Sequence, residues 1–307
     1  MASFAQSYAL SFYQCRRCAL RISVAQFVKV DRVDHMNWLG AFTIALGFLG
    51  YVLGLYCARK VTVRVTALLA VFVALVLAVP AIIYDLYYAR VLGEPIWLYR
   101  IRAVPGSELL ASLAGVLAGW VQGRMVSHLR LSQLGKRFLV PVVFGFAISL
   151  PYLKPLFRPL RPGTLREEWK GEACLQSTPS TCGPAAAATI VRHLGGRLFE
   201  RELAREAFTC SSGTENWYLA RTLHRHGFQT DFLLSDPSKV PLPAIAGVRL
   251  RSLGNSGHFI ALLARDGDKL VLADPMEGLS TNTLADLEGP YKFTGFFMLI
   301  RATDSKH

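Results

Sequence analysis

The segment STCGPAAAATIVRHLGG, residues 180–196, places a cysteine where a polar loop turns into an alanine-rich helix. Gly183 and Pro184 follow Cys182, and proline suits a first helical turn because the backbone there needs no N–H donor. The N–H groups at a helix N-terminus are unpaired and carry partial positive charge, so a thiol beside them ionises more easily. Cys182 is therefore a candidate nucleophile; a buried structural cysteine is the alternative.

A thiol nucleophile needs a general base and a group that orients the base. His258 opens an apolar strand after the polar turn LGNSG, and Asp274 ends the next predicted strand. The turn ARDGDK joins these strands into a hairpin, so the start of one lies beside the end of the other. His258 and Asp274 are thus predicted neighbours at one sheet edge. Three other histidines lie near the C-terminal ends of predicted helices, where histidine commonly faces the last carbonyl groups: His193, His224 and His226.

Gln176 lies six residues before Cys182, on the loop that leads to it. A side-chain amide there can donate a hydrogen bond to the oxyanion that forms when a thiolate attacks a carbonyl group. On its own, a glutamine in a loop is usually only a solvated residue. With Cys182, His258 and Asp274 it completes a set suited to acyl transfer, for which we expect no metal and no cofactor.

The elements that must position these residues indicate an α+β domain over residues 164–303. Helical patterns cover 184–195, 199–208 and 214–228, and strand patterns follow at 229–235, 244–250, 258–267, 269–275 and 294–301. Helices followed by an antiparallel sheet are typical of an α+β fold. A stretch of about 140 residues can bury a core of its own.

The formal net charge of +13 resides entirely in the first half of the chain. Residues 164–307 carry 16 Lys/Arg and 16 Asp/Glu, so residues 1–163 carry the whole excess. That half is also the apolar half, and basic loops between apolar runs indicate a membrane protein close to lipid headgroups. No RNP pattern, zinc-finger spacing or basic helix favours nucleic acid as a partner, so we exclude it.

Four apolar stretches cover about 37–57, 65–88, 107–123 and 138–153. Crossing the bilayer core takes about 20 residues, so the first two are long enough and the last two lie at the lower limit. Small residues such as Gly115 and Gly119 would let helices approach closely. We therefore expect an α-helical transmembrane domain over 37–157 with about four spans; buried helices of a soluble protein are the alternative.

Residues 1–36 resemble neither a signal peptide nor a folded domain. Met36 stands directly before the first apolar stretch, which raises the hypothesis that translation starts there; N-terminal sequencing would test it. The motif CRRC at 15–18 has the spacing of a redox or zinc site, but no second ligand pair completes one. Prolines in KPLFRPLRPG form a stiff exit from the last apolar stretch, and Gly163 marks the predicted domain boundary.

The segment CLQSTPSTCGPAAAATIVRHLGG resembles the nucleophile segment of the C39 family of cysteine peptidases, whose papain-like domains remove double-glycine leader peptides. A glutamine six residues before the cysteine, a Cys-Gly pair and a small-residue helix ending in glycine recur in that family. Four later segments are similar to the family's next helix, its Leu-Pro-Ala-Ile strand, its histidine-to-aspartate hairpin and its closing strand: TENWYLARTLHRHGF, VPLPAIAGVRL, HFIALLARDGDKLVLADPMEG and YKFTGFFMLI. The resemblance covers about 172–300.

By this resemblance Cys182 is the nucleophile, His258 the base, Asp274 the orienting group and Gln176 the oxyanion donor. Two features depart from the family. Thr181 precedes the cysteine where the family usually has an acidic residue, and the membrane part comes first, without the GxxxxGK[ST] loop of a transporter ATPase. Export by this chain alone is therefore not supported, whereas the resemblance implies cleavage after a small-residue pair such as Gly-Gly.

The predicted function is that of a membrane-anchored cysteine endopeptidase acting on a leader peptide or precursor protein, with a separate export or sorting system as a possible partner. Two alternatives use the same fold. One is a module that binds a peptide without cleaving it, and the other is an acyl- or amide-transferring enzyme with the same Cys-His-Asp trio.

The organisation and the family indicate a bacterial inner-membrane protein. With four spans, the basic loops 58–64 and 123–137 share one face, which the positive-inside rule makes cytoplasmic. The peptidase domain would then face a periplasm-like space, although Arg158, Arg161 and the basic N-terminal segment oppose this. In an oxidising space Cys174 and Cys210 could form a disulfide; two reduced, buried thiols are the other interpretation.

Overall fold

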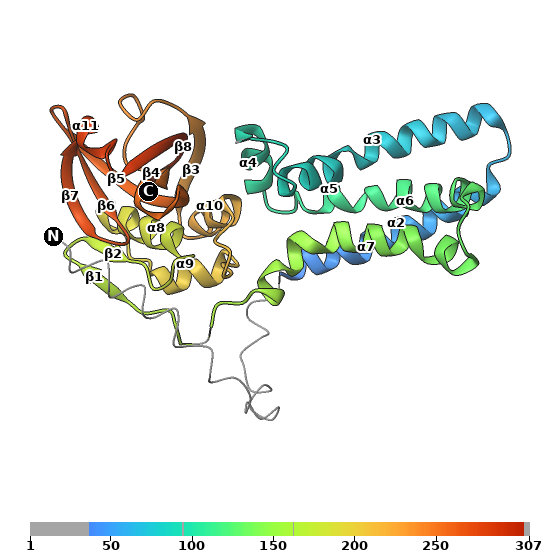
Figure 1. The fold of residues 1–307 in the computed structure, drawn as a ribbon, viewed down its shortest axis with the longest axis horizontal. Coiled ribbons are helices and arrows are strands. Elements are labelled where there is room, and N and C mark those ends of the chain that lie inside the picture. The colour runs from blue at the N-terminus through green and yellow to red at the C-terminus, as the bar shows by residue number, and fades with distance from the viewer. Residues whose placement is uncertain (1–36, 94, 162, 304–307) are drawn as a thin grey trace. The chain divides into compact units, whose positions relative to one another are not determined.

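A computed structural model of the chain describes residues 37–93, 95–161 and 163–303 (Figure 1). Residues 35–307 form one compact unit, in which we distinguish a helical region, residues 37–157, and a sheet region, residues 163–303. The hypotheses about residues 1–36, including the CRRC motif, concern residues outside the described part. The domain bounds 37–157 and 164–303 remain a prediction.

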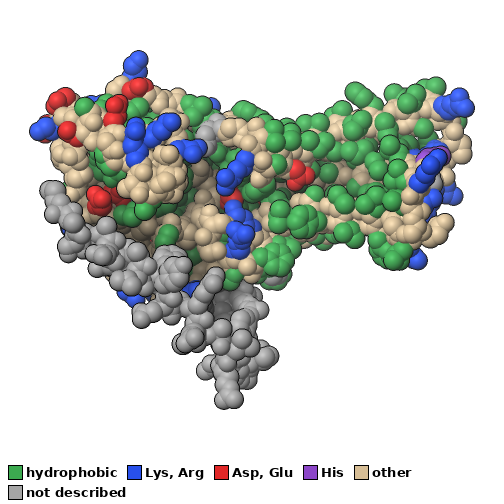
Figure 2. Space-filling model, in the orientation of Figure 1, with side chains coloured by type: hydrophobic (Ala, Val, Ile, Leu, Met, Phe, Trp, Pro, Cys, Tyr) green, Lys and Arg blue, Asp and Glu red, His purple; other side chains and the backbone are tan. Residues whose placement is uncertain are grey.

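Three long apolar helices dominate the helical region: α2 (Trp38–Lys60), α3 (Arg64–Tyr88) and α7 (Gln133–Phe157). Each is long and apolar enough to cross a membrane. Their outward side chains are largely hydrophobic and exposed, and Figure 2 shows such side chains over much of this surface. An apolar surface of this extent is typical of helices that face lipid.

The third predicted span, 107–123, forms two short helices instead, α5 (Leu109–Ser112) and α6 (Ala114–Arg124). They follow α4 (Ile96–Ala103) and are interrupted at Leu113, and a 3-10 turn, Val126–His128, comes after α6. The described residues therefore contain three helices of membrane-spanning length, and the prediction of about four spans is not confirmed. Hydropathy alone did not reveal the break, because the residue at the break, Leu113, continues the apolar run from one helix to the next.

Glycines allow α2 and α6 to pack with their backbones in contact. A Cβ atom on Gly115 would lie 1.9 Å from the carbonyl oxygen of Gly47, and one on Gly119 would lie 1.9 Å from that of Tyr51. The contacts advance by four residues on both helices, so α2 and α6 run parallel. Close packing at small residues is the main source of helix association where no hydrophobic driving force exists between apolar helices.

The sheet region begins with the strand pair β1 (Glu168–Lys170) and β2 (Ala173–Leu175) and three helices, α8 (Cys182–His193), α9 (Glu200–Glu206) and α10 (Asn216–Arg225). An antiparallel six-stranded sheet follows, in the order β3-β8-β4-β5-β6-β7. Its strands are β3 (Phe228–Leu234), β4 (Ala244–Leu250), β5 (Ser256–Asp266), β6 (Lys269–Asp274), β7 (Gly278–Thr283) and β8 (Tyr291–Ala302), with the 3-10 turn Arg251–Leu253 after β4 and α11 (Leu284–Leu287) after β7.

This order of helices and then an antiparallel sheet confirms the predicted α+β class. The strands that sequence patterns did not predict are the pair β1–β2 and β7. The β7 sequence GLSTNT has no apolar alternation, because an edge strand that is largely exposed does not need apolar side chains.

The core of the sheet region depends on how deeply α8 is buried. Every residue of α8 from Cys182 to Val191 is buried, and the helix packs against β5. Four consecutive alanines, Ala185 to Ala188, let the helix backbone approach the sheet. The N-terminus of α8 therefore reaches the surface of the sheet itself.

We predict that Gly119→Ala destabilises the helical region, because the new Cβ would collide with the carbonyl oxygen of Tyr51 and force α2 and α6 apart. Overpacking of this kind costs roughly 1–3 kcal/mol. The measurement is thermal unfolding of the full chain in detergent micelles, followed by circular dichroism.

The matched control is Gly135→Ala in the first turn of α7, where the nearest atom to a new Cβ is the Ser132 hydroxyl oxygen at 3.3 Å. Alanine favours a helix over glycine by about 0.5–1 kcal/mol, so this control should unfold at the same or a higher temperature. Equal unfolding temperatures for the two variants would contradict the close packing of α2 on α6.

Candidate active site

Cys182 is the first residue of α8, with Thr181 as the N-cap residue. The first backbone N–H groups of a helix have no partner inside the helix, so the thiol lies beside free donors and the positive end of the helix dipole. The cysteine is 9% exposed, which leaves its thiol at the boundary between the core and the surface. The helix starts two residues earlier than its alanine pattern predicted.

His258 lies near the start of β5, is buried, and forms a hydrogen bond from Nε2 to Oδ1 of Asp274 at 2.8 Å. The Cys182 side chain is a second neighbour that acts on the imidazole and favours its protonated form. Since Asp274 occupies Nε2, Nδ1 is the ring nitrogen left for the thiol. Burial on its own would lower the pKa of His258, but the interactions with Asp274 and Cys182 outweigh it and raise the pKa to about 9.

Asp274, the last residue of β6, is buried and accepts three hydrogen bonds. Besides His258, the backbone N–H of Met276 donates to Oδ1 at 2.7 Å and the hydroxyl of Tyr291 donates to Oδ2 at 2.6 Å. Burial would raise the pKa of this carboxyl, but these donors outweigh it and the pKa is lowered. The carboxylate is thus held ionised and fixed in orientation.

Gln176 follows β2, and its backbone N–H donates to the carbonyl oxygen of Pro275 at 2.8 Å. The strand that leads to Gln176, β2, is also fixed to α8, since the Thr189 hydroxyl accepts a hydrogen bond from the backbone N–H of Cys174 at 2.9 Å. The amide oxygen Oε1 of Gln176 is buried and has no hydrogen-bond partner among the described residues. The carboxamide therefore retains hydrogen-bonding capacity that the protein itself does not use.

The structure thus brings Cys182 and the hydrogen-bonded pair His258–Asp274 together and ties the Gln176 backbone to the turn after Asp274. The other histidines interact elsewhere. Nε2 of His224 bonds to Thr230, Nε2 of His226 pairs with Glu206, and His193 is the exposed last residue of α8.

Two residues near the site were not found from the sequence. Tyr291 starts β8, which is not adjacent to β6 in the sheet, so no spacing links it to Asp274. Glu200 starts α9, is fully buried, and accepts bonds from the backbone N–H of Ser177 at 2.8 Å and from its hydroxyl at 2.5 Å. Burial raises the pKa of Glu200. A glutamate at the start of an amphipathic helix gives no signal that it supports a loop elsewhere.

Cys174 and Cys210 are both free, buried thiols, so the disulfide considered from the sequence is not formed in this structure. The sulfur of Cys210 contacts the hydroxyl of Ser212 at 3.0 Å, and burial raises the pKa of Cys174. In the part of the chain that the structure describes, no group of three or more His, Cys, Asp or Glu side chains is arranged to hold a metal ion.

Comparison with solved structures finds similar folds at low identity. The peptidase domain of Streptococcus ComA, a bifunctional ABC transporter, is 18% identical with a TM-score of 0.36, and the match covers 42% of this chain and 96% of that one. A double-glycine-motif protease from an AMS/PCAT transporter, solved with the leader peptide, is 17% identical with a TM-score of 0.37, covering 48% of this chain and 99% of that one.

A model of the Peptidase C39 family matches residues 170–305. An uncharacterised protein of Methanothermobacter marburgensis is 36% identical over 103 residues, which are 34% of this chain and 70% of that protein. The lactococcin-G-processing and transport ATP-binding protein LagD of Lactococcus lactis is 27% identical over 116 residues, 36% of this chain and 16% of that protein. Through its sheet region, the chain belongs to the Peptidase C39 family.

Proposed function

We propose that this protein is a membrane-anchored cysteine endopeptidase that cleaves a leader or precursor peptide after a pair of small residues of the Gly-Gly type. The observation that carries the proposal is the buried His258–Asp274 hydrogen bond beside Cys182, which lies at the N-terminus of α8 and helps to raise the pKa of His258. Membership in the C39 family supports peptidase chemistry, and a relative named for processing lactococcin G supports a precursor as substrate.

In the first half of the reaction, Cys182 transfers its proton to His258, and the thiolate attacks the scissile carbonyl carbon. The charge that develops on the carbonyl oxygen is stabilised by the side chain of Gln176 and the backbone N–H of Cys182. Asp274 keeps the imidazolium in place and stabilises its charge. The imidazolium then protonates the departing amine, the C–N bond breaks, and a thioester to Cys182 remains.

In the second half, His258 is neutral and accepts a proton from a water molecule as the water oxygen attacks the thioester carbonyl. The same oxyanion donors serve again, the C–S bond breaks, and the thiolate–imidazolium pair is restored. One water is consumed per peptide bond, and the products are one carboxylate and one amine.

Membrane attachment through α2, α3 and α7 is the proposed role of the helical region, and a bacterial inner membrane is the proposed location. Basic residues end both α2 and α6, and Figure 2 shows Lys and Arg side chains at this end of the helices. The parallel course of α2 and α6 supports placing both basic ends on one side, which the positive-inside rule makes cytoplasmic. The sheet region would then face a periplasm-like space, with an export or sorting system as a partner.

The first prediction for this mechanism is that Cys182→Ala or His258→Ala lowers turnover of a double-glycine peptide by roughly 10⁴-fold or more, because nucleophile and base act as one unit. His224→Ala is the control, since that side chain is exposed and forms hydrogen bonds with Thr230; its turnover should stay within about twofold. A thiol-directed peptide probe should label the wild type and not Cys182→Ala. Loss of activity in His224→Ala with none in His258→Ala would overturn the assignment.

The second prediction concerns pH. The kcat/KM of the wild type should fall above about pH 9, where His258 loses its proton. In Asp274→Asn the hydrogen bond to a carboxylate is gone, so this alkaline limb should move towards the ordinary histidine value near 6.5. Asp268→Asn in the exposed hairpin turn should leave the limb in place. An unchanged limb in Asp274→Asn would show that Asp274 does not set the pKa of His258.

The raised pKa has a matching effect on stability. Protonated His258 contributes fully to the free energy of unfolding below its unfolded pKa near 6.5, and the contribution is lost as pH rises through about 9. The lowered pKa of Asp274 acts in the opposite sense: its contribution is present above its unfolded pKa and is lost as the pH falls through the folded value.

The third prediction is that Tyr291→Phe lowers kcat roughly tenfold with little change in KM, because Asp274 loses a charge-assisted hydrogen bond that fixes its orientation. The measurement is a double-mutant cycle with Asp274→Asn. In the Asp274→Asn background the tyrosine change should have a much smaller effect. Equal effects in both backgrounds would show that Tyr291 does not act through Asp274.

A further inference from the structure

The helical region and the sheet region share one hydrophobic core. Tyr99 of α4 is 2% exposed, and its ring lies against three aromatic side chains of the sheet region, with ring centres 5.9 Å from Trp217, 5.6 Å from Phe232 and 5.4 Å from Phe296. Aromatic contacts of this kind dominate the energetics of cores and interfaces. The two regions are therefore packed together and not merely linked by the chain at 158–163.

The same helix α4 covers the outer edge of the sheet. Arg100 donates to both carboxylate oxygens of Asp231 in β3, at 2.9 and 3.2 Å, and to the carbonyl oxygen of Phe232 at 3.0 Å. The pair is about half exposed, so its energy is small, but it occupies an edge that would otherwise offer unpaired backbone groups.

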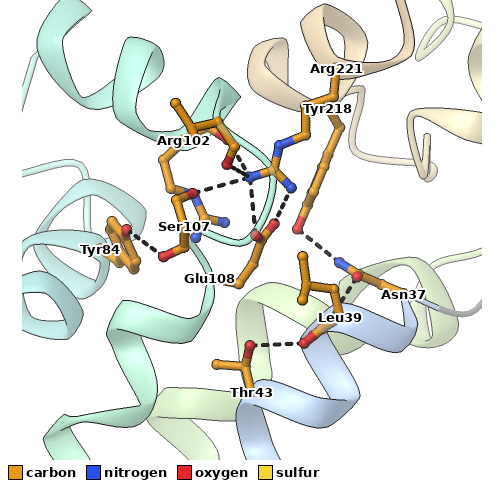
Figure 3. Close-up of polar contacts among 11 residues, drawn as sticks. Asn37, Leu39, Thr43, Tyr84, Arg102, Ser107, Glu108, Tyr218 and Arg221 are labelled. Atoms are coloured by element: carbon orange, nitrogen blue, oxygen red, sulfur yellow. Dashed lines mark hydrogen bonds and ion pairs between the residues drawn. The ribbon is translucent and has the colours of Figure 1, made fainter. Parts of the chain in front are cut away.

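A buried ion pair fixes α10 to the segment between α4 and α5, as Figure 3 shows. Arg221 of α10 pairs with Glu108, and the two side chains are 7% and 0% exposed. The same guanidinium donates to the carbonyl oxygens of Arg102 and Val104 and to the hydroxyl oxygen of Ser107. Breaking a buried pair on one side leaves an uncompensated charge at a cost of several kcal/mol, so α10 cannot easily separate from this segment.

The ends of two membrane-length helices also contact α10. Asn37, the N-cap residue of α2, donates from its side chain to the hydroxyl of Tyr218 at 2.8 Å (Figure 3). Lys154, in the last turn of α7, pairs with Glu215, the N-cap residue of α10, at 2.9 Å. A helix of this length matches the thickness of the hydrocarbon core, so these ends lie near the membrane surface.

The opposite side of α10 supports the nucleophile. Leu219, the residue after Tyr218, lies against Gly183, where a Cβ atom would be 3.6 Å from its side chain. Helix α10 therefore contacts the helix ends on one side and the backbone next to Cys182 on the other. A helix with its side chains is about 10–12 Å across, so the thiol lies roughly one helix diameter from the membrane ends of α2 and α7.

We propose that this junction holds the active site at a fixed short distance from the membrane, and that the favoured substrates are precursors anchored in the same membrane with the scissile bond only a few residues from the anchor. An extended chain spans about 3.3 Å per residue, so roughly three to four residues bridge the distance. A peptidase on a flexible tether would show no such preference. The proposal presupposes the peptidase function proposed above.

The experiment measures the reach of Cys182 directly, without a peptide substrate. The full chain is reconstituted in phosphatidylethanolamine–phosphatidylglycerol vesicles that contain a lipid-anchored chloroacetamide on a spacer of about 10, 20 or 40 Å. Alkylation of Cys182 is followed by mass spectrometry of its own peptide, because Cys57, Cys174 and Cys210 are also free thiols. A soluble chloroacetamide and double-glycine peptide cleavage are measured in parallel.

We expect the 20 Å spacer to label Cys182 about threefold faster than the 40 Å spacer, as effective concentration falls roughly with the −3/2 power of spacer length. Labelling only by the 40 Å spacer, or equally by all three, would overturn the membrane-proximal site. In either case reaction with the soluble probe and peptide cleavage would leave the peptidase function standing. If the full chain shows the expected spacer dependence but does not cleave the peptide, the peptidase function is rejected and the short distance between Cys182 and the membrane remains supported.

The role of the junction is tested by the double variant Glu108→Gln/Arg221→Met, which removes both buried charges together, with Arg225→Met as the control. Arg225 lies on the same helix, but its side chain is exposed and pairs with Glu206. The spacer dependence should flatten in the double variant and remain steep in Arg225→Met, with soluble-probe labelling unchanged in both. A dependence that stays equally steep in the double variant would show that the ion pair does not hold the site in place.

Discussion

The close approach of the α8 backbone to the sheet is the constraint on which the rest of the sheet region depends. The N-terminus of α8 presents the Cys182 thiol to the sheet, and the imidazole beside it, His258, comes from a strand, β5. Helices normally pack at a distance set by their side chains, so Cys182 and His258 can meet only because the buried face of α8 carries alanine and glycine. Small residues bury less apolar surface than large ones. The larger side chains of α10 and of the sheet supply the remaining apolar surface of this core.

The residues of the site lie at the ends of helices and strands. Cys182 begins α8, His258 lies at the start of β5, Asp274 ends β6 and Tyr291 begins β8. At such positions the backbone leaves the regular ladder, so side chains and free N–H groups can converge on one point, as the N–H of Met276 does on Asp274. The carboxylate has three hydrogen-bond donors, which explains why it stays ionised although it is buried.

Small residues play the same part in the helical region, where Gly115 and Gly119 seat α6 on α2. The two regions then meet at α10, which has a different partner on each side. Arg221 and Tyr218 face the helical region, whereas Leu219 faces the nucleophile segment. Because α10 is closely packed on both sides, the position of the helical region fixes the position of the backbone next to Cys182. The helical region is in this sense part of the structure that supports the site, and not only a means of attachment.

The sequence by itself determined the local features: the long apolar helices, the helix after Cys182, and the hairpin that places His258 beside Asp274. Each of these follows from periodicity, turn residues or length, which act over short stretches of chain. Other features emerged only in the folded structure: the break within the third predicted span, the edge strand β7, the hydrogen bond from Tyr291 to Asp274 and the pairing of Arg221 with Glu108. These features join residues from elements that are not neighbours in the chain, and a polar residue in a sequence carries no mark of the distant partner that will bury it.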